Sequence, residues 1–277
     1  VVRWVREVLG RRVTVVIRCG AWRVGRSRAL KKYIRRVLAL LPFEPKFLGT
    51  VGVDCVYVGH PAIQRIPEEG SGARFRAARG IGADDPVLLV LPGSRLNEVK
   101  HLVGIFGGTV RRLSREIDRL RVVVPVVPHV RPLVEASVEG WGVPVEIVDD
   151  EREKRAAFDA GTAALAASGT VSLELALARV PMVVAYRAEA IVGWFALNVL
   201  KVPSVVLVNL ILDRPSVRES LQGRCTADEL AEGLRPLMHD SEERRRVLGD
   251  LDELRLRMGV DGEVPGRRAA RAVLELL

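Results

Sequence analysis

Short apolar runs alternate with stretches of helical spacing through the middle of the chain. The apolar runs occupy residues 87–91, 121–127, 145–148, 163–167, 181–186 and 205–208, and the helical stretches lie near residues 97–119, 129–140, 151–160 and 171–178. Strands that are apolar on both faces are typical of a parallel sheet with helices on both sides. With right-handed crossovers, the pattern predicts an α/β fold built on a Rossmann-like, doubly wound parallel sheet.

Weaker patterns flank this region. Residues 37–41 and 55–58 also resemble strands, whereas residues 59–86 hold few apolar positions, which favours a linker with one short helix. After Pro215, helical spacing returns at residues 226–238, 240–258 and 264–277. We therefore expect a small domain at 1–60, a linker at 61–85, a large domain at 86–240 and C-terminal helices at 241–277.

One apolar stretch, Ile191–Leu212, is long enough to suggest a membrane span. Lys201 lies at its middle, where a charge costs about 2.5–3.5 kcal/mol on insertion scales. Pro203 follows, and residues 205–208 are β-branched, so the stretch favours a helix, a break and a buried strand. A partly exposed apolar helix that contacts a membrane surface stays open as an alternative.

The composition of the chain restricts the kinds of partner and site that we expect. The formal net charge is +9, which favours anionic partners such as phosphorylated molecules or anionic lipid. Basic residues are scattered and aromatic residues make up only 5%, so we expect no nucleic acid partner. Three distant cysteines form no disulfide framework and fit a reducing, cytoplasmic setting. Four dispersed histidines offer no metal-ligand spacing, and neither a Walker loop nor a nucleophile elbow occurs, so we expect no metal and no cofactor.

The loop after the run at 87–91 is the first candidate site. Gly93 lets a ligand approach the backbone, Ser94 can cap the next helix, and Arg95 offers a guanidinium for phosphate, with Glu98 one turn later. Taken alone, this loop is equally typical of an ordinary helix start with a solvent-facing arginine.

The loop after the run at 163–167 carries a stronger signal. Ser168, Gly169 and Thr170 place hydroxyls and a glycine at a helix N-terminus, which suits a diphosphate. Ser172 and Glu174 follow, and the carboxylate of Glu174 can accept hydrogen bonds from ribose hydroxyls. Simple helix capping is the alternative.

Other strand ends give weak signals. Tyr186 offers a ring on which a base can stack, but a tyrosine there more often packs in the core. Asn209, Glu219 and Gln222 offer polar groups for a sugar or phosphate, and a helix with polar residues at 219 and 222 is more often a solvated face.

Together these loops resemble those of the lipid-A-disaccharide synthase family. The matching strings, in order, are RVLALLPFEPKF, VYVGHP, LLVLPGSRLNEV, PVVPHV, AALAASGTVSLELALARVPMVVAYR and VPSVVLVNLILDRPSVRESLQ. The resemblance runs from about Ala21 to Leu277 and implies a GT-B fold, in which two Rossmann-like domains face each other across a cleft. It implies that 86–240 is the C-terminal, nucleotide-sugar-binding domain and that 1–60 is a remnant of the acceptor-side domain.

The implied activity is that of a hexosyltransferase of lipid A biosynthesis, and hence of lipopolysaccharide biosynthesis. It transfers diacylglucosamine from UDP-2,3-diacylglucosamine to 2,3-diacylglucosamine 1-phosphate without a metal, so protein groups must neutralise the diphosphate. The resemblance assigns leaving-group stabilisation to Arg95 and Asn209. It assigns donor binding to Gly93, Ser94, Arg95, Glu98, Ser168, Gly169, Thr170, Ser172, Glu174, Tyr186, Asn209, Glu219 and Gln222.

The sequence departs from the family at its start. Residues 1 to about 20 do not resemble it, and the family's glycine-rich first loop and acidic general base have no counterpart here. We therefore expect an N-terminally truncated or frame-disrupted chain that binds donor but lacks a general base.

The resemblance and the positive charge predict the binding partners of the chain. We expect a UDP-sugar donor, a lipid acceptor, peripheral contact with the anionic cytoplasmic face of the inner membrane, and possible homodimerisation. One alternative is another UDP-sugar enzyme, such as a peptidoglycan N-acetylglucosaminyltransferase or a UDP-sugar epimerase. The other is a non-catalytic protein that binds the membrane surface.

Overall fold

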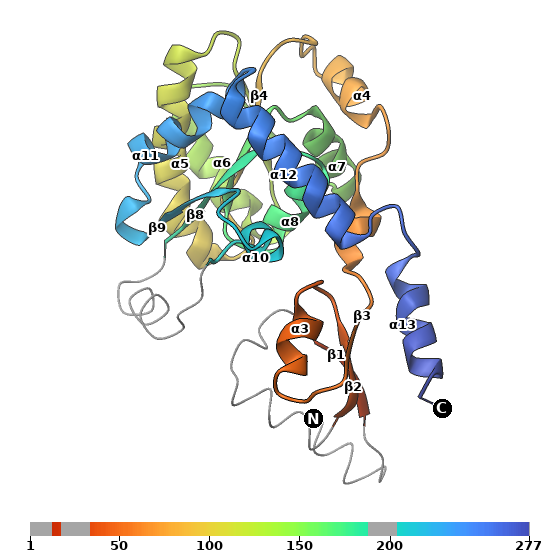
Figure 1. The fold of residues 1–277 in the computed structure, drawn as a ribbon. Helices are drawn as coiled ribbons and strands as arrows, with labels where there is room; N and C mark the ends of the chain where they lie inside the picture. Colours follow the sequence, from red (N-terminus) through yellow and green to blue (C-terminus); the bar gives the residue numbers. More distant parts are fainter. Residues whose placement is uncertain (1–12, 18–33, 188–203, 277) are drawn as a thin grey trace. The chain divides into compact units, whose positions relative to one another are not determined.

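The structure is a computed structural model that describes residues 13–17, 34–187 and 204–276 (Figure 1). These residues form two compact units. The smaller unit comprises the described residues of Val1–Gln64 together with those of Arg255–Leu277, and the larger comprises those of Arg65–Leu254. The functional domain boundaries expected from the sequence stay a prediction.

The larger unit contains a parallel sheet of six strands in the order β6-β5-β4-β7-β8-β9. The strands are β4 (Val87–Leu91), β5 (Arg121–Pro125), β6 (Val145–Val148), β7 (Ala163–Ala167), β8 (Met182–Tyr186) and β9 (Arg218–Leu221). The chain moves outwards from β4 to β6, returns to β7 beside β4, and then moves outwards the other way. This is the doubly wound order of a Rossmann-like sheet, with its switch point between β4 and β7.

Helices cover both faces of this sheet, as right-handed crossovers require. The helices of the larger unit are α4 (Ser71–Ala78), α5 (Leu96–Glu116), α6 (Arg131–Val138), α7 (Glu151–Ala160), α8 (Val171–Leu177), α10 (Leu207–Leu212), α11 (Ala227–Leu234) and most of α12 (Glu242–Met258), with short 3-10 helices at Pro128–Val130, Glu139–Trp141, Gln222–Arg224 and Arg235–Met238. A further 3-10 helix, Pro61–Arg65, starts in the smaller unit and ends at the first residue of the larger one. Helix α5 contacts α6 and α11, whereas α4 packs on α7 and α8 on α10.

The core explains why the apolar runs become strands. Every residue of β4 and of β7 is buried, because each strand has a neighbour on both sides and helices above and below. Leu91 pairs with Ala166 across these two strands, so the loops that follow them start side by side. Five of the six strands predicted for this region are confirmed, with ends that differ by at most two residues.

The predicted strand at 205–208 is wrong. Residues from Leu207 form helix α10, and the sixth strand is instead β9, which pairs in parallel with β8. Strand β9 has the sequence RESL and buries only Ser220, so it carries no apolar run that would reveal it. The expected helix through positions 219 and 222 is corrected in the same way: Glu219 lies in β9, and Gln222 starts a 3-10 helix.

The smaller unit contains a parallel sheet in the order β1-β2-β3, from β1 (Val13–Ile17), β2 (Ile34–Ala39) and β3 (Cys55–Tyr57), with α3 (Glu44–Gly49) and α13 (Pro265–Leu274). The strands predicted at 37–41 and 55–58 are thus confirmed in type. Ala272 of α13 packs against Leu38, Leu40 and Val58, so the last helix belongs to the same core as β2.

Within the described ranges, no helix is both long and apolar enough to cross a membrane. Most of the apolar stretch at 191–212, including Lys201 and Pro203, lies outside these ranges.

Candidate functional site

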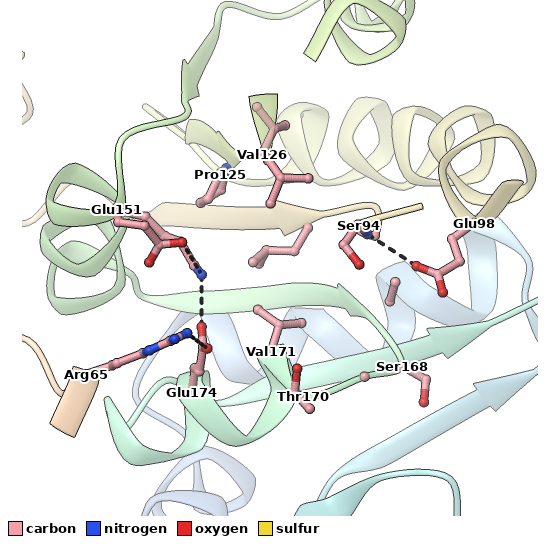
Figure 2. A pocket seen from close by; sticks show the side chains of 16 residues that line it. Arg65, Ser94, Glu98, Pro125, Val126, Glu151, Ser168, Thr170, Val171 and Glu174 are labelled. Carbon is pink, nitrogen blue, oxygen red and sulfur yellow. Dashed lines mark hydrogen bonds and ion pairs between the residues drawn. The ribbon is translucent and has the colours of Figure 1, made fainter. Parts of the chain in front are cut away.

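A cavity of about 250 Å³ lies at the carboxyl edge of the larger sheet, where the strand order reverses (Figure 2). The loops after β4, β5 and β7 and residues of α5, α7 and α8 line it. Ligands of open parallel α/β sheets bind at such switch points, because neighbouring loops diverge there and leave a crevice. The lining residues are Arg65, Leu91, Gly93, Ser94, Glu98, Pro125, Val126, Val127, Glu151, Lys154, Ala167, Ser168, Gly169, Thr170, Val171 and Glu174.

The turn after β4 depends on glycine. Gly93 has a φ of +124°, and a Cβ atom placed on it would lie 2.8 Å from the Cβ of Glu98 and 3.7 Å from the Cβ of Ala167. Both the backbone conformation and the close approach exclude a side chain. Because Ala167 is the last residue of β7, the contact also shows that this turn lies directly beside the turn that follows β7.

The start of α5 differs from the expected capping arrangement. Arg95, not Ser94, is the N-cap residue, and no side chain caps the helix. Instead, Glu98 accepts a hydrogen bond from the Ser94 amide at 3.2 Å and pairs with the Arg95 guanidinium. His129 Nε2 lies 2.8 Å from the Ser94 carbonyl oxygen, which can only accept, so this nitrogen carries the proton. These contacts fix the turn and leave the Arg95 side chain 80% exposed.

The turn after β7 is held by its own hydroxyl groups. Ser168 Oγ donates to the carbonyl of Val205 at 3.0 Å, and the buried Ser172 Oγ donates to that of Gly169 at 2.7 Å. Thr170 is exposed and is the N-cap residue of α8, without a side-chain cap. A Cβ atom on Gly169 would meet nothing within 4 Å, so the backbone here is open to a ligand. Of the first amides of α8, those of Ser172 and Leu173 already bond to the carbonyls of Gly169 and Thr170.

Glu174, one turn into α8, is held by two cations. Its Oε2 lies 2.9 Å from Lys154 Nζ, and its Oε1 lies 3.3 Å from an Arg65 guanidinium nitrogen. Lys154 also lies 3.5 Å from Glu151 Oε1. Figure 2 shows this ion-paired group at one end of the cavity, with Ser94, Glu98 and Ser168 at the other.

Sequence reasoning missed Lys154 and Arg65. Lys154 is one of five successive charged residues at the start of α7, and nothing in that run distinguishes the side chains that line the cavity. Arg65 ends a 3-10 helix inside the expected linker. The signal that identifies both is the three-dimensional proximity to Glu174.

Of the sequence-predicted site residues, seven line the cavity: Gly93, Ser94, Glu98, Ser168, Gly169, Thr170 and Glu174. Arg95 adjoins it, since it follows Ser94 and pairs with Glu98. Ser172 lies beneath the turn as a buried hydrogen-bond donor. The remaining candidates, Tyr186, Asn209, Glu219 and Gln222, are not among the lining residues.

Asn209 and Glu219 form a separate network. Asn209 is buried; its amide nitrogen donates to the Val217 carbonyl at 2.9 Å and to Glu219 Oε1 at 2.7 Å, and its oxygen accepts from the Val217 amide at 2.8 Å. Glu219 in turn pairs with the Ser204 hydroxyl and accepts from the Val205 amide. The network therefore ties the start of α10 to strand β9. Because Val205 also accepts from Ser168, this network supports the Gly169 turn from behind.

Neither cysteine chemistry nor a metal cluster appears in the described part of the chain. Cys55 and Cys225 are unpaired thiols, and burial raises the pKa of Cys55 to about 12, so its thiol stays protonated and unreactive at neutral pH. Among the described residues, no three His, Cys, Asp or Glu side chains are grouped as metal ligands.

Comparison with known proteins adds the family context. Residues 17–257 match the model of the family described as lipid-A-disaccharide synthetase. The lipid-A-disaccharide synthase of Rhodospirillum centenum is 45% identical over 93% of this chain and 64% of that protein. The corresponding enzyme of Rhodopseudomonas palustris is 43% identical over 93% of this chain and 65% of that protein. The chain thus spans a little less than two thirds of the length of these relatives.

Solved structures show the same fold. Anabaena HepE in complex with UDP and glucose has a TM-score of 0.57 at 12% identity, covering 98% of this chain and 74% of that one. The UDP-GlcNAc 2-epimerase of Neisseria meningitidis bound to UDP-GlcNAc has a TM-score of 0.55 at 13% identity, covering 83% of this chain and 62% of that one. These likenesses confirm the predicted GT-B, Rossmann-like fold class.

Proposed function

The chain belongs to the lipid-A-disaccharide synthase family, and from that premise we propose that it is a glycosyltransferase of lipid A biosynthesis. The reaction joins UDP-2,3-diacylglucosamine to 2,3-diacylglucosamine 1-phosphate. One observation carries the proposal: the two glycine turns, after β4 and after β7, line a single cavity together with Glu174. A nucleoside diphosphate needs such a combination, with an open glycine backbone for the phosphates and an acceptor for the ribose.

The donor fits the cavity in one direction. The diphosphate lies against the Gly169 turn, where the backbone is open. The ribose lies towards Glu174, and the base lies against the apolar wall of Pro125, Val126 and Val127. The lining side chains include two basic and three acidic residues, so they carry no net positive charge. Backbone amides and Arg95 must therefore supply the attraction for the phosphates.

Arg95 is the group that we propose stabilises the leaving UDP. As the acceptor hydroxyl attacks the anomeric carbon, the bond from that carbon to the diphosphate oxygen breaks and negative charge grows on UDP. The Arg95 side chain is 80% exposed, so its pair with Glu98 is screened by solvent and is easily exchanged for a phosphate. Asn209, also expected to act on the leaving group, has its amide engaged by Val217 and Glu219, so we assign it to support of the Gly169 turn.

Titration of UDP into the purified chain tests the donor site. We expect binding in the millimolar range or tighter, and a loss of about tenfold or more in Arg95→Ala combined with Glu174→Gln, since each loses a charge-assisted contact. Arg115→Ala is the matched control, because Arg115 is an exposed arginine in the last turn of the same helix and does not line the cavity. Unchanged UDP affinity in the double variant would refute the site assignment.

Donor identity is the second test. With acceptor present, we expect turnover of UDP-2,3-diacylglucosamine and not of underivatised UDP-N-acetylglucosamine. Preferential turnover of the underivatised sugar would instead support another UDP-sugar enzyme.

We also propose that the chain works at the cytoplasmic surface of the inner membrane and forms homodimers. Its net charge of +9 supports contact with anionic lipid headgroups. Membrane contact is measured by co-sedimentation with vesicles that contain anionic lipid, compared with neutral vesicles. Dimer formation is measured by sedimentation equilibrium, and a monomer at all concentrations would contradict it.

A further inference from the structure

Lys154 places a largely buried ammonium group in the wall of the cavity. Its side chain is 16% exposed, and that of its partner Glu174 is 14% exposed, with 2.9 Å between Nζ and Oε2. Removing such a pair from water costs free energy that the mutual attraction need not recover, so a buried pair is weak evidence for a stabilising role. Its position at a ligand cavity points instead to a role in binding.

The surroundings of Lys154 restrict its movement. It projects from the first turn of α7, with its ammonium 5.6 Å from the ring centre of Phe158 one turn later. Glu151, one turn earlier, lies 3.5 Å from the same ammonium. The lysine is therefore held between two carboxylates and a ring, and Glu174 on the neighbouring helix is held by it.

Arg65 contributes less to this restraint. Its side chain is 56% exposed, and its guanidinium is 3.3 Å from Glu174 Oε1. Solvent screens an ion pair of this kind, and its typical contribution is small. Of the two cations on Glu174, Lys154 is thus the one whose contact is short and shielded from water.

The carboxylate that results is held by two cations and is still able to accept hydrogen bonds. An ionised carboxylate has about four lone-pair sites, of which Lys154 and Arg65 occupy one on each oxygen. The remaining sites suit hydroxyl donors and repel phosphate. Within the cavity the open backbone of the Gly169 turn offers the phosphates a separate place, so hydroxyl groups of the ligand are left for Glu174.

We propose that Lys154 is a positioning residue that fixes Glu174 as the acceptor for the ribose diol, so that the site selects a ribonucleoside diphosphate over its 2′-deoxy counterpart. This inference rests on the proposed function and adds a specificity determinant to it. Lys154 acts through Glu174 and not on the phosphates. Its removal must therefore change how strongly the 2′-hydroxyl is recognised.

The experiment compares UDP with 2′-deoxyuridine diphosphate by calorimetric titration. In the wild-type chain we expect UDP to bind about tenfold more tightly, the value of one charge-assisted hydrogen bond. In Lys154→Met we expect this preference to fall to about twofold or less, with the affinity for the 2′-deoxy compound changed much less than that for UDP. Arg65→Met should keep most of the preference, because its ion pair is exposed.

Equal weakening of both nucleotides in Lys154→Met would overturn the inference, because it would place Lys154 on the diphosphate. A preference that persists in that variant would overturn it as well. Lys154→Arg, which keeps the charge and a donor, should restore part of the preference, and it serves as the test if the methionine variant does not fold. A wild-type chain that binds no UDP would refute the proposed function itself, a result distinct from UDP binding with unaltered discrimination.

Discussion

Replacing Gly93 by alanine should damage both folding and binding, by an amount that the structure allows us to estimate. Gly93 has a φ of +124°, and its new Cβ would lie 2.8 Å from Glu98 Cβ and 2.9 Å from Glu98 Oε2. A residue held in such a backbone region costs about 1–3 kcal/mol. Overpacking against Glu98 costs a further 1–3 kcal/mol or so, because Glu98 cannot move without losing its bond to the Ser94 amide. The expected loss is on the order of 3 kcal/mol.

Gly169→Ala is the matched comparison. Gly169 does not have a positive φ, and its new Cβ would meet nothing within 4 Å. At a compatible position, this change typically stabilises by about 0.4–1 kcal/mol through the unfolded chain. We nevertheless expect weaker UDP binding, because the added methyl group occupies the space through which the diphosphate approaches the backbone.

Urea denaturation followed by circular dichroism, together with UDP titration, separates the two effects. Gly93→Ala should lower the unfolding midpoint by roughly 1 M, given slopes of about 1–3 kcal/mol per molar urea. Gly169→Ala should leave the midpoint unchanged or raise it, and lose UDP affinity. Equal stability of the two variants would refute the steric reasoning. Undiminished UDP affinity in Gly169→Ala would refute the placement of the diphosphate.

Three further changes test other parts of the structure. Gly107→Ala should cost about 1–3 kcal/mol in urea denaturation, because its Cβ would clash with Nε1 of Trp141, and an unchanged midpoint would contradict the packing. Asn209→Ala should cost about 2–4 kcal/mol in the same assay, since it leaves the buried backbone amide and carbonyl of Val217 without these partners; a loss below about 1 kcal/mol would contradict the network. Burial is the main cause that raises the pKa of Glu44, so the folded state favours its protonated form. The stability that the Glu44 carboxyl group contributes is therefore fully present at pH values below its pKa in the unfolded chain. That stability is lost as the pH rises through its pKa in the folded chain. Glu44→Gln should thus gain stability relative to wild type as pH increases from about 4 to about 7, and parallel stability curves would contradict this.

The strands that could be predicted are those whose burial is complete. Strands β4 and β7 consist wholly of apolar residues, and their central place in the sheet requires that composition. The glycine turns that follow them were predictable for a related reason, since a glycine and hydroxyl residues after a buried strand mark a helix N-terminus at the sheet edge. The sequence alone therefore located the two turns at the sheet edge, whereas the strand order that makes them neighbours comes from the structure.

The charged end of the cavity was not predictable in the same way. Lys154 lies in a run of charged residues on a helix that is otherwise solvated, and a periodic pattern does not show which charge faces a neighbouring helix. Arg65 is 109 positions from its partner Glu174 in sequence. Contacts of that kind depend on how α7, α8 and the segment before α4 are packed, which local patterns do not encode.

In the region from Ser204 to Gln222, a buried polar side chain explains why a β-branched apolar run does not form the strand that its pattern predicts. The apolar run at 205–208 satisfies every criterion for a strand, yet α10 begins inside it. The side chain of Asn209 bonds to both the amide and the carbonyl of Val217, and this bridge holds the chain in a reversal between α10 and β9. The polar β9 then takes the place at the sheet edge beside β8. Residues that the family resemblance marked as ligand contacts, Asn209 and Glu219, are thus first of all the groups that decide which segment becomes the sixth strand, and any effect of their loss on UDP binding must be measured against that loss of structure.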